Sequence, residues 1–466
     1  MPEQATRRER DALGEIEVPA DALWGASTQR AVENFPISGE RLPRDFVGAL
    51  AQIKRAAARA NRELGVVDPE RATWIEQAAA EVESGALDAH FPVDVFQTGS
   101  GTSTNMNANE VIARRAEQLR GAARDPRGVS EPRIHPNDHV NASQSSNDVI
   151  PTALHVAARE SVHERLLPAL EHLAEAFRAK QRMLGSAVKL GRTHGMDATP
   201  VRIGDEFGAW ASQLEGAARR VREAADGLGS VALGGTAVGN GLNCPAGFAE
   251  RVCEQLSEWN GRRYERAPDP FAAQGAQDAA VHLSGALRGA AAASFKIASD
   301  VRLLASGPRG GIAELRLPAI QPGSSIMPGK VNPVLCEAVL QVSAQVVGHD
   351  AAIGLAGLSG QLELNTFLPL VARNLLESIR LLSQVSVVFA DRCVAGLEVD
   401  VERARGWAEQ STALATALVP RIGYDRAAEL AKAAFSSGRT VREVALEAGV
   451  LPEEELDALL DLDRFV

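Results

Sequence analysis

VHLSGALRGAAAASFKIASDVRLL, residues 281–304, is the stretch of sequence that decides the fold class. Apolar or small residues recur along it at alternating spacings of four and three, which is the pattern of a helix that packs along one stripe. These positions are Leu283, Leu287, Ala290, Ser294, Ile297, Val301 and Leu304. At a rise of about 1.5 Å per residue the stripe predicts a rod about 30 Å long. Such a rod is longer than an ordinary globular helix.

Four other segments have the same character. Residues 335–353 and 368–389 carry stripes of the same kind, and residues 151–180 and 204–228 are further candidates for long helices. Their stripes hold Ala and Ser where the core of a single chain usually holds Leu or Phe. Five such rods predict a bundle whose faces are too extensive for one chain to cover, so we expect burial against copies of the same chain. A monomeric bundle covered by the first domain is the alternative.

The segments on either side of the rods differ in composition. Residues 46–62 and 70–83 predict helices, and residues 91–109 predict a polar loop or several turns. Residues 120–144 hold several Gly and Pro residues, which mark a domain boundary. The expected protein is therefore all-α and has three domains. These are a mainly helical N-terminal domain (1–144), a central bundle of about five long helices (145–398) and a small helical C-terminal domain (399–466).

Composition and charge exclude several classes of protein. Forty-nine Lys and Arg against sixty Asp and Glu give a net charge of −11, which argues against nucleic acid and anionic membranes as partners. Apolar residues make up 45% and charged residues 23%, close to the averages for globular proteins, so disorder and fibrous structure are disfavoured. No apolar run approaches the roughly 20 residues that span a bilayer.

The cysteines and the N-terminal residues indicate the compartment. The chain has four cysteines and no C-x-x-C pair, so we expect no disulfide framework, zinc ribbon or iron–sulfur cluster. Arg7, Arg8 and Arg10 are followed by acidic residues rather than by an apolar stretch, which argues against a secretory signal. The expected location is therefore the reducing cytoplasm.

Four polar segments hold the candidate functional residues: 98–109, 135–148, 191–200 and 323–333. Connections between helices in bundles need only about two to eight residues. Longer segments that are rich in hydrogen-bond donors are therefore either recognition loops or poorly ordered surface.

The segment GSSIMPGKVNP, residues 323–333, places Lys330 and Asn332 just before a predicted helix that starts near Pro333. A lysine, an amide and the free N–H groups of a helix N-terminus together favour a carboxylate. The alternative is an exposed loop with an incidental lysine.

The segment HPNDHVNASQSSND, residues 135–148, offers two histidines four apart, but Pro136 and the turn-forming residues after it disfavour a shared helix face for a metal. Ser145, Ser146 and Asn147 are donors that precede the helix expected from Pro151. These residues and Asp148 can also be interpreted as a cluster that caps the helix, and for one of the four this is the simpler interpretation.

The segment GRTHGMDATP, residues 191–200, contains Thr193 and His194. A histidine beside hydroxyl and carboxylate groups can move protons near neutral pH, although a lone histidine is more often structural. The segment QTGSGTSTNMN, residues 97–107, lacks the G-K-[ST] ending of a phosphate loop. We interpret it as a donor-rich loop for carboxylate oxygens.

The four segments supply neutral donors, one lysine and one histidine, and we expect no metal, thiol or nucleotide site. These groups suit the binding of a small dicarboxylate and the transfer of a proton. Removal of a proton next to a carboxylate generates an aci-carboxylate dianion. Such a species survives only where preorganised donors and a cation meet the developing charge.

The segments TGSGTSTNMNANE, HPNDHVNASQSSND, GRTHGMDATP and GSSIMPGKVNP resemble the signatures of class II fumarase, in the fumarase and aspartase superfamily. The resemblance extends over nearly the whole chain. Thr193-His194, Ser145-Ser146-Asn147 and Gly329-Lys330 are similar to fumarase, whereas aspartase typically has Thr-Gln, Ser-Thr-Asn and Ala-Lys. The nearest alternative is aspartate ammonia-lyase or another fumarate-releasing lyase. An alternative outside the enzymes is a non-catalytic scaffold protein that kept the helical assembly.

The resemblance implies a homotetramer with each active site built from three subunits. It also implies reversible, stereospecific hydration of fumarate to L-malate in the tricarboxylic acid cycle, without metal or organic cofactor. By motif, Ser324 is the expected base for the C3 proton, and His194 with Glu337 is the expected second proton-handling unit. The matching substrate-binding positions are Ser100, Thr102, Ser145, Ser146, Asn147, Thr193, Ser325, Lys330 and Asn332.

The resemblance also implies a second, non-catalytic anion site at His135, Asn137 and Asp138. Pro132 stands three residues before His135, where many relatives have Arg, so that site is expected to be weakened or absent. Arg202 and Asp205 also depart from the usual Thr and Gln, and an ion pair between them is the default interpretation.

Overall fold

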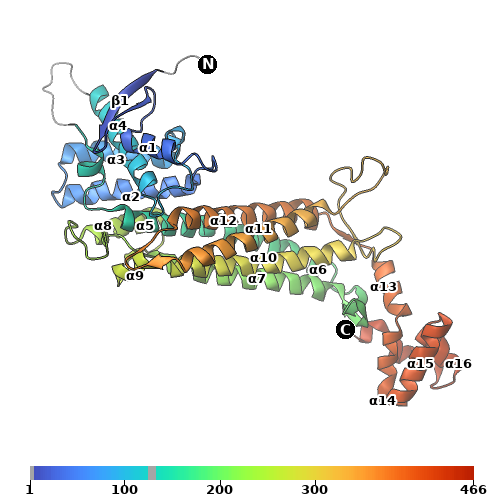
Figure 1. Ribbon diagram of the computed structural model, residues 1–466. Coiled ribbons are helices and arrows are strands. Elements are labelled where there is room, and N and C mark those ends of the chain that lie inside the picture. Colours follow the sequence, from blue (N-terminus) through green and yellow to red (C-terminus); the bar gives the residue numbers. More distant parts are fainter. Residues whose placement is uncertain (1–4, 124–132, 466) are drawn as a thin grey trace. The chain divides into compact units, whose positions relative to one another are not determined.

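The computed structural model describes residues 5–123 and 133–465 (Figure 1). The described chain is mainly helical, and its named strands form two-stranded pairs, which confirms the predicted all-α class. The chain divides into two compact units. Unit 1 comprises Met1–Leu167, Arg219–Gly289 and Ala344–Leu382, and unit 2 comprises Pro168–Ala218, Ala290–Ser343 and Ser383–Val466. The three domains expected at 1–144, 145–398 and 399–466 stay a prediction.

Unit 1 contains the helices that the sequence predicted at residues 46–62 and 70–83. They are α2 (Arg44–Glu63) and α3 (Pro69–Ser84), and they pack against each other. Phe46, Leu50 and Ile53 lie on the buried face of α2 because they recur at helical spacing. The Asp68 carboxylate accepts the backbone N–H of Arg71 and caps the start of α3.

The same unit holds several shorter elements. These are β1 (Thr6–Asp11) paired antiparallel with β2 (Gly14–Pro19), α1 (Ala26–Asn34), α5 (Ser146–Ser161), β5 (Ser230–Val231) paired with β6 (Glu265–Arg266), α8 (Phe248–Asn260), α9 (Pro270–Gly275), and β8 (Gly360–Gln361) paired with β9 (Leu364–Asn365). The longer helix α4 (Thr102–Ala123) also belongs to this unit.

The expectation that residues 91–109 form only loop or turns is wrong for their second half, because α4 begins at Thr102. Asn105, Asn107 and Asn109 weaken the helical pattern of the sequence. In the fold all three are buried, and the side-chain amide of Asn107 donates to the carbonyl oxygen of His90 at 2.9 Å. Tertiary hydrogen bonds to these asparagines therefore override their low helix propensity.

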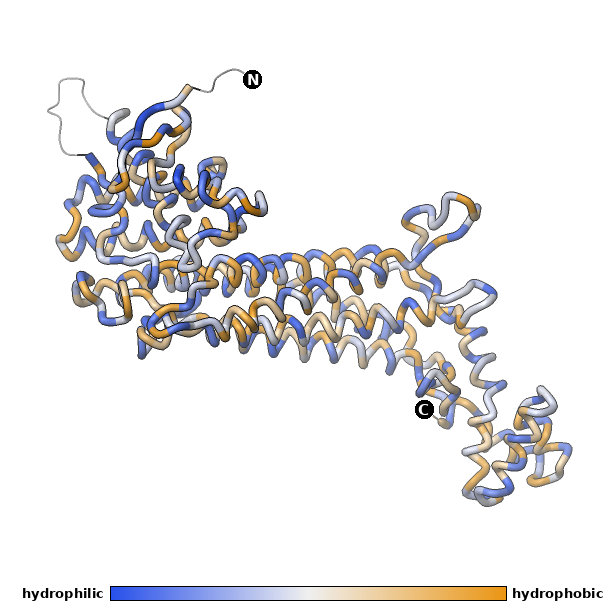
Figure 2. The backbone as a smooth tube through the Cα atoms, viewed as in Figure 1, coloured by the Kyte–Doolittle hydropathy of each residue, from blue (hydrophilic) through white to orange (hydrophobic). Residues whose placement is uncertain are grey.

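Four of the five predicted rods are single long helices. They are α7 (Ile203–Asp226), α10 (Asp278–Leu304), α11 (Val334–Gly357) and α12 (Leu368–Phe389). The seven stripe positions of α10 are each at most 6% exposed, which confirms that the stripe is its buried side. Figure 2 shows apolar and polar residues alternating along these helices.

The fifth rod differs from the prediction. Residues 151–180 are not one helix, because a π-helical turn at Val162–Leu166 separates α5 from α6 (Leu167–Met183). α5 also begins at Ser146 rather than near Pro151, since Ser145 and Asp148 form a capping box. Pro151 is accommodated inside the helix near its start.

Unit 2 has an aromatic core and a small helical subdomain. Phe177, Phe207, Trp210 and Phe389 pack with ring centroids 5.0–6.4 Å apart. The antiparallel hairpin of β3 (Val188–Thr193) and β4 (Met196–Arg202) contributes Val188 and Leu190 to a second cluster with the C-terminal helices. Those helices are α13 (Val401–Gln410), α14 (Val419–Ile422), α15 (Tyr424–Ser437), α16 (Val441–Glu447) and α17 (Glu453–Leu460). A short pair joins β7 (Leu315–Arg316) to β10 (Glu398–Val399).

No helix among the described residues is both long enough and apolar enough to cross a membrane.

His155 on α5 makes the stability of the protein dependent on pH. Its Nδ1 donates to the carbonyl oxygen of Ser230 at 2.9 Å, and burial lowers its pKa from 6.5 to about 4. The unfolded chain therefore binds one more proton than the folded chain between pH 4 and 6.5. The free energy of unfolding should fall by up to about 3 kcal/mol as the pH drops through that window.

The variant His155→Gln should lose this component of the pH dependence. Urea unfolding at fixed protein concentration, repeated from pH 7 to pH 4.5 for both proteins, measures the difference. Equal slopes of unfolding free energy against pH for the two proteins would contradict the prediction.

Candidate functional site

The first polar segment forms a loop that leads into α4. The side-chain oxygen of Gln97 accepts the N–H of Thr104 at 3.0 Å and its hydroxyl at 2.9 Å. The hydroxyls of Ser100 and Thr102 lie 2.8 Å apart. Both hydroxyls therefore lie at the N-terminus of α4, where free N–H groups and the helix macrodipole favour an anion.

A close backbone approach fixes this loop. A Cβ atom built on Gly99 would lie 1.8 Å from the carbonyl oxygen of Thr366, so only glycine fits there. The carbonyl oxygen of Gly99 accepts the N–H of Leu368, the first residue of α12, at 3.0 Å. The loop is thereby attached to the start of a long helix within unit 1.

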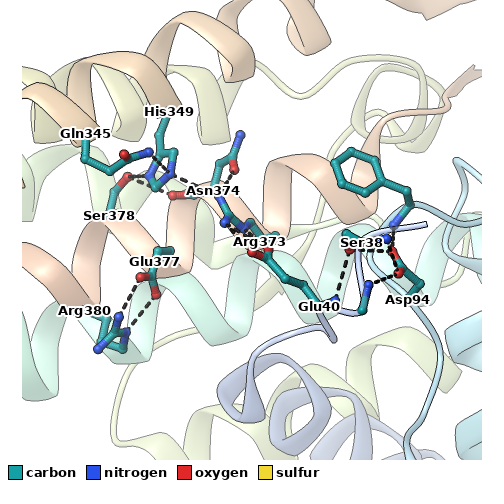
Figure 3. Close-up of polar contacts among 12 residues, drawn as sticks. Ser38, Glu40, Asp94, Gln345, His349, Arg373, Asn374, Glu377, Ser378 and Arg380 are labelled. Atoms are coloured by element: carbon teal, nitrogen blue, oxygen red, sulfur yellow. Dashed lines mark hydrogen bonds and ion pairs between the residues drawn. The ribbon is translucent and has the colours of Figure 1, made fainter. Parts of the chain in front are cut away.

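Asp94 supports the loop from its other end (Figure 3). Its carboxylate accepts the hydroxyl of Ser38 and the backbone N–H groups of Ser38, Gly39 and Phe96 at 2.7–2.8 Å. Burial raises the pKa of Asp94, but these hydrogen bonds outweigh burial and hold it below its ordinary value of 3.8. The carboxylate is therefore ionised at neutral pH and fixes the residues just before Gln97.

A second polar group in Figure 3 joins α11 and α12 to the segment before α2. Arg373 pairs with Glu40 at 2.9 Å and donates to Nε2 of His349 at 3.1 Å. Since arginine can only donate, Nε2 accepts, and the ring proton is on Nδ1, which donates to the hydroxyl of Ser378 at 3.0 Å. Burial and the neighbouring Arg373 lower the pKa of His349, so the ring is neutral at physiological pH.

The donors Ser145, Ser146 and Asn147 lie together at the N-terminus of α5. The Ser145 hydroxyl accepts the N–H of Asn147 at 3.3 Å, and the Asp148 carboxylate accepts the N–H of Ser145 at 2.9 Å. Ser145 and Asp148 thus form the cap that the sequence allowed as the simpler interpretation. The Asn147 side chain donates to the carbonyl oxygen of Ala237 at 2.8 Å.

The expected second anion site is one exposed π-helical turn, Pro136–Val140. Nδ1 of His135 lies within hydrogen-bond distance of the N–H groups of Asn137 and Asp138, at 3.3 and 3.1 Å, and 3.2 Å from the Asp138 carboxylate. Nδ1 of His139 accepts the N–H of His135 at 2.7 Å. Among the described residues, no group of three His, Cys, Asp or Glu could hold a metal ion. Pro132 lies outside the described residues.

In unit 2, Thr193 and His194 lie at the tip of the β3–β4 hairpin. Thr193 pairs with Met196, so His194 and Gly195 form a two-residue turn with φ values of 56° and 72°. Two positive φ values are typical of a type I′ turn, and a histidine in the left-handed region is uncommon. The His194 side chain is exposed on this turn, and its backbone lies in the left-handed region.

Ion pairs join both ends of this hairpin to neighbouring segments. Arg192 pairs with Glu314 at 2.7 Å and Lys189 pairs with Glu206 at 2.9 Å, while Lys189 and Glu314 lie 3.3 Å apart. Glu314 and Lys189 are almost fully buried.

The loop that contains Ser324 is closed at its base. The N–H of Gly323 donates to the carbonyl oxygen of Lys330 at 2.8 Å, and the Asn332 side chain donates to the carbonyl oxygen of Gly323 at 2.7 Å. Ser325 and Lys330 are exposed on it. Glu337 lies in the first turn of α11, which follows the loop.

The hydroxyl of Ser324 is hydrogen-bonded within its own loop. Its oxygen accepts the backbone N–H groups of Ile326 at 3.2 Å and Met327 at 3.1 Å. Two N–H dipoles aimed at one hydroxyl oxygen stabilise negative charge on it. A serine base needs such stabilisation when its hydroxyl gives up a proton.

A cavity of about 720 Å³ in unit 2 lies beside this loop. Lys330 and Asn332 line it, together with four arginines that the sequence analysis did not single out: Arg302, Arg309, Arg316 and Arg403. Asp400 is the acidic residue of the lining and pairs with Arg316 at 2.6 Å. The excess of positive charge favours a dianion. Only the folded chain gathers these arginines, so the sequence carried no signal for them.

The predicted site residues thus form two sets. Unit 1 holds Ser100, Thr102, Ser145, Ser146, Asn147 and the turn with His135, Asn137 and Asp138, whereas unit 2 holds Thr193, His194, Ser324, Ser325, Lys330, Asn332 and Glu337. Over the described ranges of one chain, no hydrogen bond or ion pair joins His194 to Glu337. A site shared between subunits requires none.

Comparison with known proteins identifies the family. Residues 14–348 match the family described as "Lyase", and residues 414–466 match "Fumarase C C-terminus". The chain belongs to the class II fumarase family. It is 52% identical to "Fumarate hydratase class II" of Thermosynechococcus vestitus over 98% of this chain and 97% of that protein. It is also 52% identical to "Fumarate hydratase class II 1" of Pseudomonas aeruginosa over 97% of each chain.

A solved structure supports the same assignment. The class II fumarase of Schistosoma mansoni superimposes with a TM-score of 0.95 at 38% identity, and the match covers 99% of each chain. The fold of this family therefore extends over the whole chain.

The loop before α4 gives a prediction about ligand binding. In Gly99→Ala the new Cβ would clash with the Thr366 backbone, which cannot move as a flexible side chain can. Displacement of the loop should weaken the affinity for succinate, a non-reactive dicarboxylate, by about tenfold or more, as expected for a misplaced binding group. Isothermal titration calorimetry measures the affinity.

Gly121→Ala is the matched control, because a Cβ there meets nothing within 4 Å and α4 tolerates alanine. Equal succinate affinity in Gly99→Ala and Gly121→Ala would show that the loop does not contribute to binding.

Proposed function

We propose that this protein catalyses the reversible, stereospecific hydration of fumarate to L-malate. The observation that carries the proposal is the Ser324 loop, in which a serine oxygen accepts two N–H groups and Lys330 and Asn332 follow six and eight residues later. Ser324 as a base and Lys330 as a cation on the same loop suit abstraction of a proton next to a carboxylate. Membership of the class II fumarase family agrees with this proton abstraction.

The reaction is most simply followed from L-malate. Ser324, as the alkoxide, removes the proton from C3, and the electron pair moves onto the adjacent carboxylate to give an aci-carboxylate dianion. Lys330 and Asn332 stabilise this dianion by charge and hydrogen bonding. The electron pair then forms the C2–C3 double bond, and the C2 hydroxyl leaves as water with a proton from the unit of His194 and Glu337.

The remaining donors bind the two carboxylates of the substrate. They are Ser100, Thr102, Ser145, Ser146, Asn147, Thr193 and Ser325. Their support in the structure is that Ser100 and Thr102 lie at the N-terminus of α4 and Ser145–Asn147 at that of α5. We retain the exposed turn of His135, Asn137 and Asp138 as a second anion site.

The proposed assembly is a homotetramer in which three subunits build each active site. Large apolar side chains are exposed on the long helices: Val347 and Leu355 in unit 1, and Phe295 and Leu303 in unit 2. Exposed apolar side chains along a bundle favour association. Light scattering should give a mass about four times 49.3 kDa, whereas a monomer mass would contradict the shared site.

The reaction is proposed to need no metal or organic cofactor, and to serve the tricarboxylic acid cycle in the cytoplasm. The test follows the ultraviolet absorbance of fumarate with purified protein, a chelator, and either L-malate or L-aspartate. Fumarate from malate alone supports the proposal. Fumarate from aspartate alone would establish the ammonia-lyase instead, and no product from either would favour another lyase substrate or the scaffold.

Ser324→Ala should lower kcat by roughly 10²–10⁴, the range for loss of a general base. Steady-state assays measure kcat, and light scattering and succinate titration check that assembly and binding persist. A kcat near that of the unchanged protein would remove Ser324 from the role of base.

Lys330→Met should lower kcat and kcat/KM together by about 10²–10³, because the lysine acts on charge that develops only in the transition state. The same assays measure both constants. A rise in KM with unchanged kcat would instead make Lys330 a uniform binding contact.

A further inference from the structure

α2 carries a lysine whose side chain is fully buried. Lys54 is 0% exposed, and burial lowers its pKa to about 7. Its Nζ donates to the side-chain oxygens of Asn141 at 2.9 Å and Gln144 at 3.0 Å. Burial of an ammonium group is costly, and a methionine would fill similar space without that cost. The two hydrogen bonds are therefore what a lysine provides at this position and a methionine would not.

Both partners of Lys54 belong to the turn that leads into α5. The Gln144 amide donates to the carbonyl oxygens of Val140 at 3.1 Å and Ala142 at 2.9 Å, and so holds the turn closed. Asn141 donates to the carbonyl oxygen of Gln144 at 3.3 Å. The ammonium group is thus bonded to the two side chains that shape residues 140–144.

The same network continues to the proposed substrate donors. The amide of Asn105 donates to Asn141 at 3.2 Å and to the hydroxyl of Ser146 at 3.1 Å. Asn141 therefore lies between Lys54 and the residue that orients Ser146. A shift of the lysine displaces Asn141, Asn105 and Ser146 in turn, because each shares a hydrogen bond with the next.

Asp148 holds the other side of the turn. Its carboxylate is fully buried and accepts the N–H groups of Ser145 at 2.9 Å, and of Gly234 and Thr236 at 3.0 Å each. Burial raises the pKa of Asp148 to about 6, whereas its hydrogen bonds and the charge of Lys54 lower it. The carboxylate is therefore ionised at neutral pH.

We propose that Lys54 is a positioning residue for the proposed fumarate site, which sets the geometry of Ser145, Ser146 and Asn147 through Asn141 and Gln144. It touches no substrate. The inference rests on the proposed function, because that function gives these three residues their role. The positioning effect is expected in kcat/KM, since a displacement near 1 Å can cost about 10²-fold in rate.

The decisive variant is Lys54→Met, which keeps the aliphatic stem and removes the donors and the charge. Its matched control is Lys180→Met, because Lys180 is also buried but donates to the carbonyl oxygens of Ala395 at 2.9 Å and Leu397 at 2.7 Å in unit 2. We expect Lys54→Met to lower kcat/KM for L-malate by about ten- to a hundredfold, and Lys180→Met to stay within about twofold. A kcat/KM of Lys54→Met within twofold of the control would overturn the proposal.

The pH profile separates positioning from a merely structural role. Removal of the positive charge of Lys54 should raise the pKa of Asp148. The acidic limb of the plot of kcat/KM against pH should therefore move to higher pH in Lys54→Met. It should not move in Lys180→Met. The thiol of Cys244 also senses Asp148, but burial raises its pKa to about 11, so it stays protonated over this range. An unmoved acidic limb would exclude electrostatic coupling to the site.

Gln144→Leu decides the question if Lys54→Met does not assemble. It removes one acceptor of Lys54 together with the two hydrogen bonds that the Gln144 amide donates within the turn, so a fall of kcat/KM is expected. An unchanged value would overturn the proposal. If the unchanged protein converts no malate, the proposed function fails. Hydrogen exchange over residues 140–148 then tests the network alone, and equal protection in Lys54→Met and Lys180→Met would overturn it.

Discussion

The buried carboxylate of Asp148 is the constraint on which the polar half of unit 1 depends. An ionised carboxylate without water must be fully hydrogen-bonded, and here its partners are the N–H of Ser145 at the start of α5 and two N–H groups more than eighty residues later. The requirement to satisfy one charge therefore brings two distant segments together. The N-terminus of α5, with its hydroxyl and amide donors, is fixed as a consequence.

The same principle recurs around the other proposed binding segments. Asp94 gathers N–H groups before the loop of Ser100, and Glu314 pairs with Arg192 in the hairpin that carries His194. In each case a buried charge lies beside a segment that carries proposed binding residues. Preorganisation of this kind lets groups that stabilise charge only weakly in solution stabilise it strongly in a site, because they need not reorient as charge develops.

The helices and the exposed groups show how much the sequence could predict. The stripes of α10, α11 and α12 were predictable because each helix buries one side of regular spacing. The starts of α4 and α5 were not, since Asn105 and Pro151 disfavour helix locally and are accommodated only by tertiary hydrogen bonds and a capping box. Lys54 could not be singled out, because α2 carries other basic residues and the burial of Lys54 depends on partners distant in sequence.

The sequence by itself determined the helical class, the long rods, and the residues of the four donor-rich segments, because periodicity and residue chemistry are local properties. It also carried the family, through the motifs of those segments. Tertiary structure alone decided that arginines from separate segments line one cavity and that Lys54 lies under the turn before α5. These features depend on which distant groups share a buried space, and no local pattern encodes that.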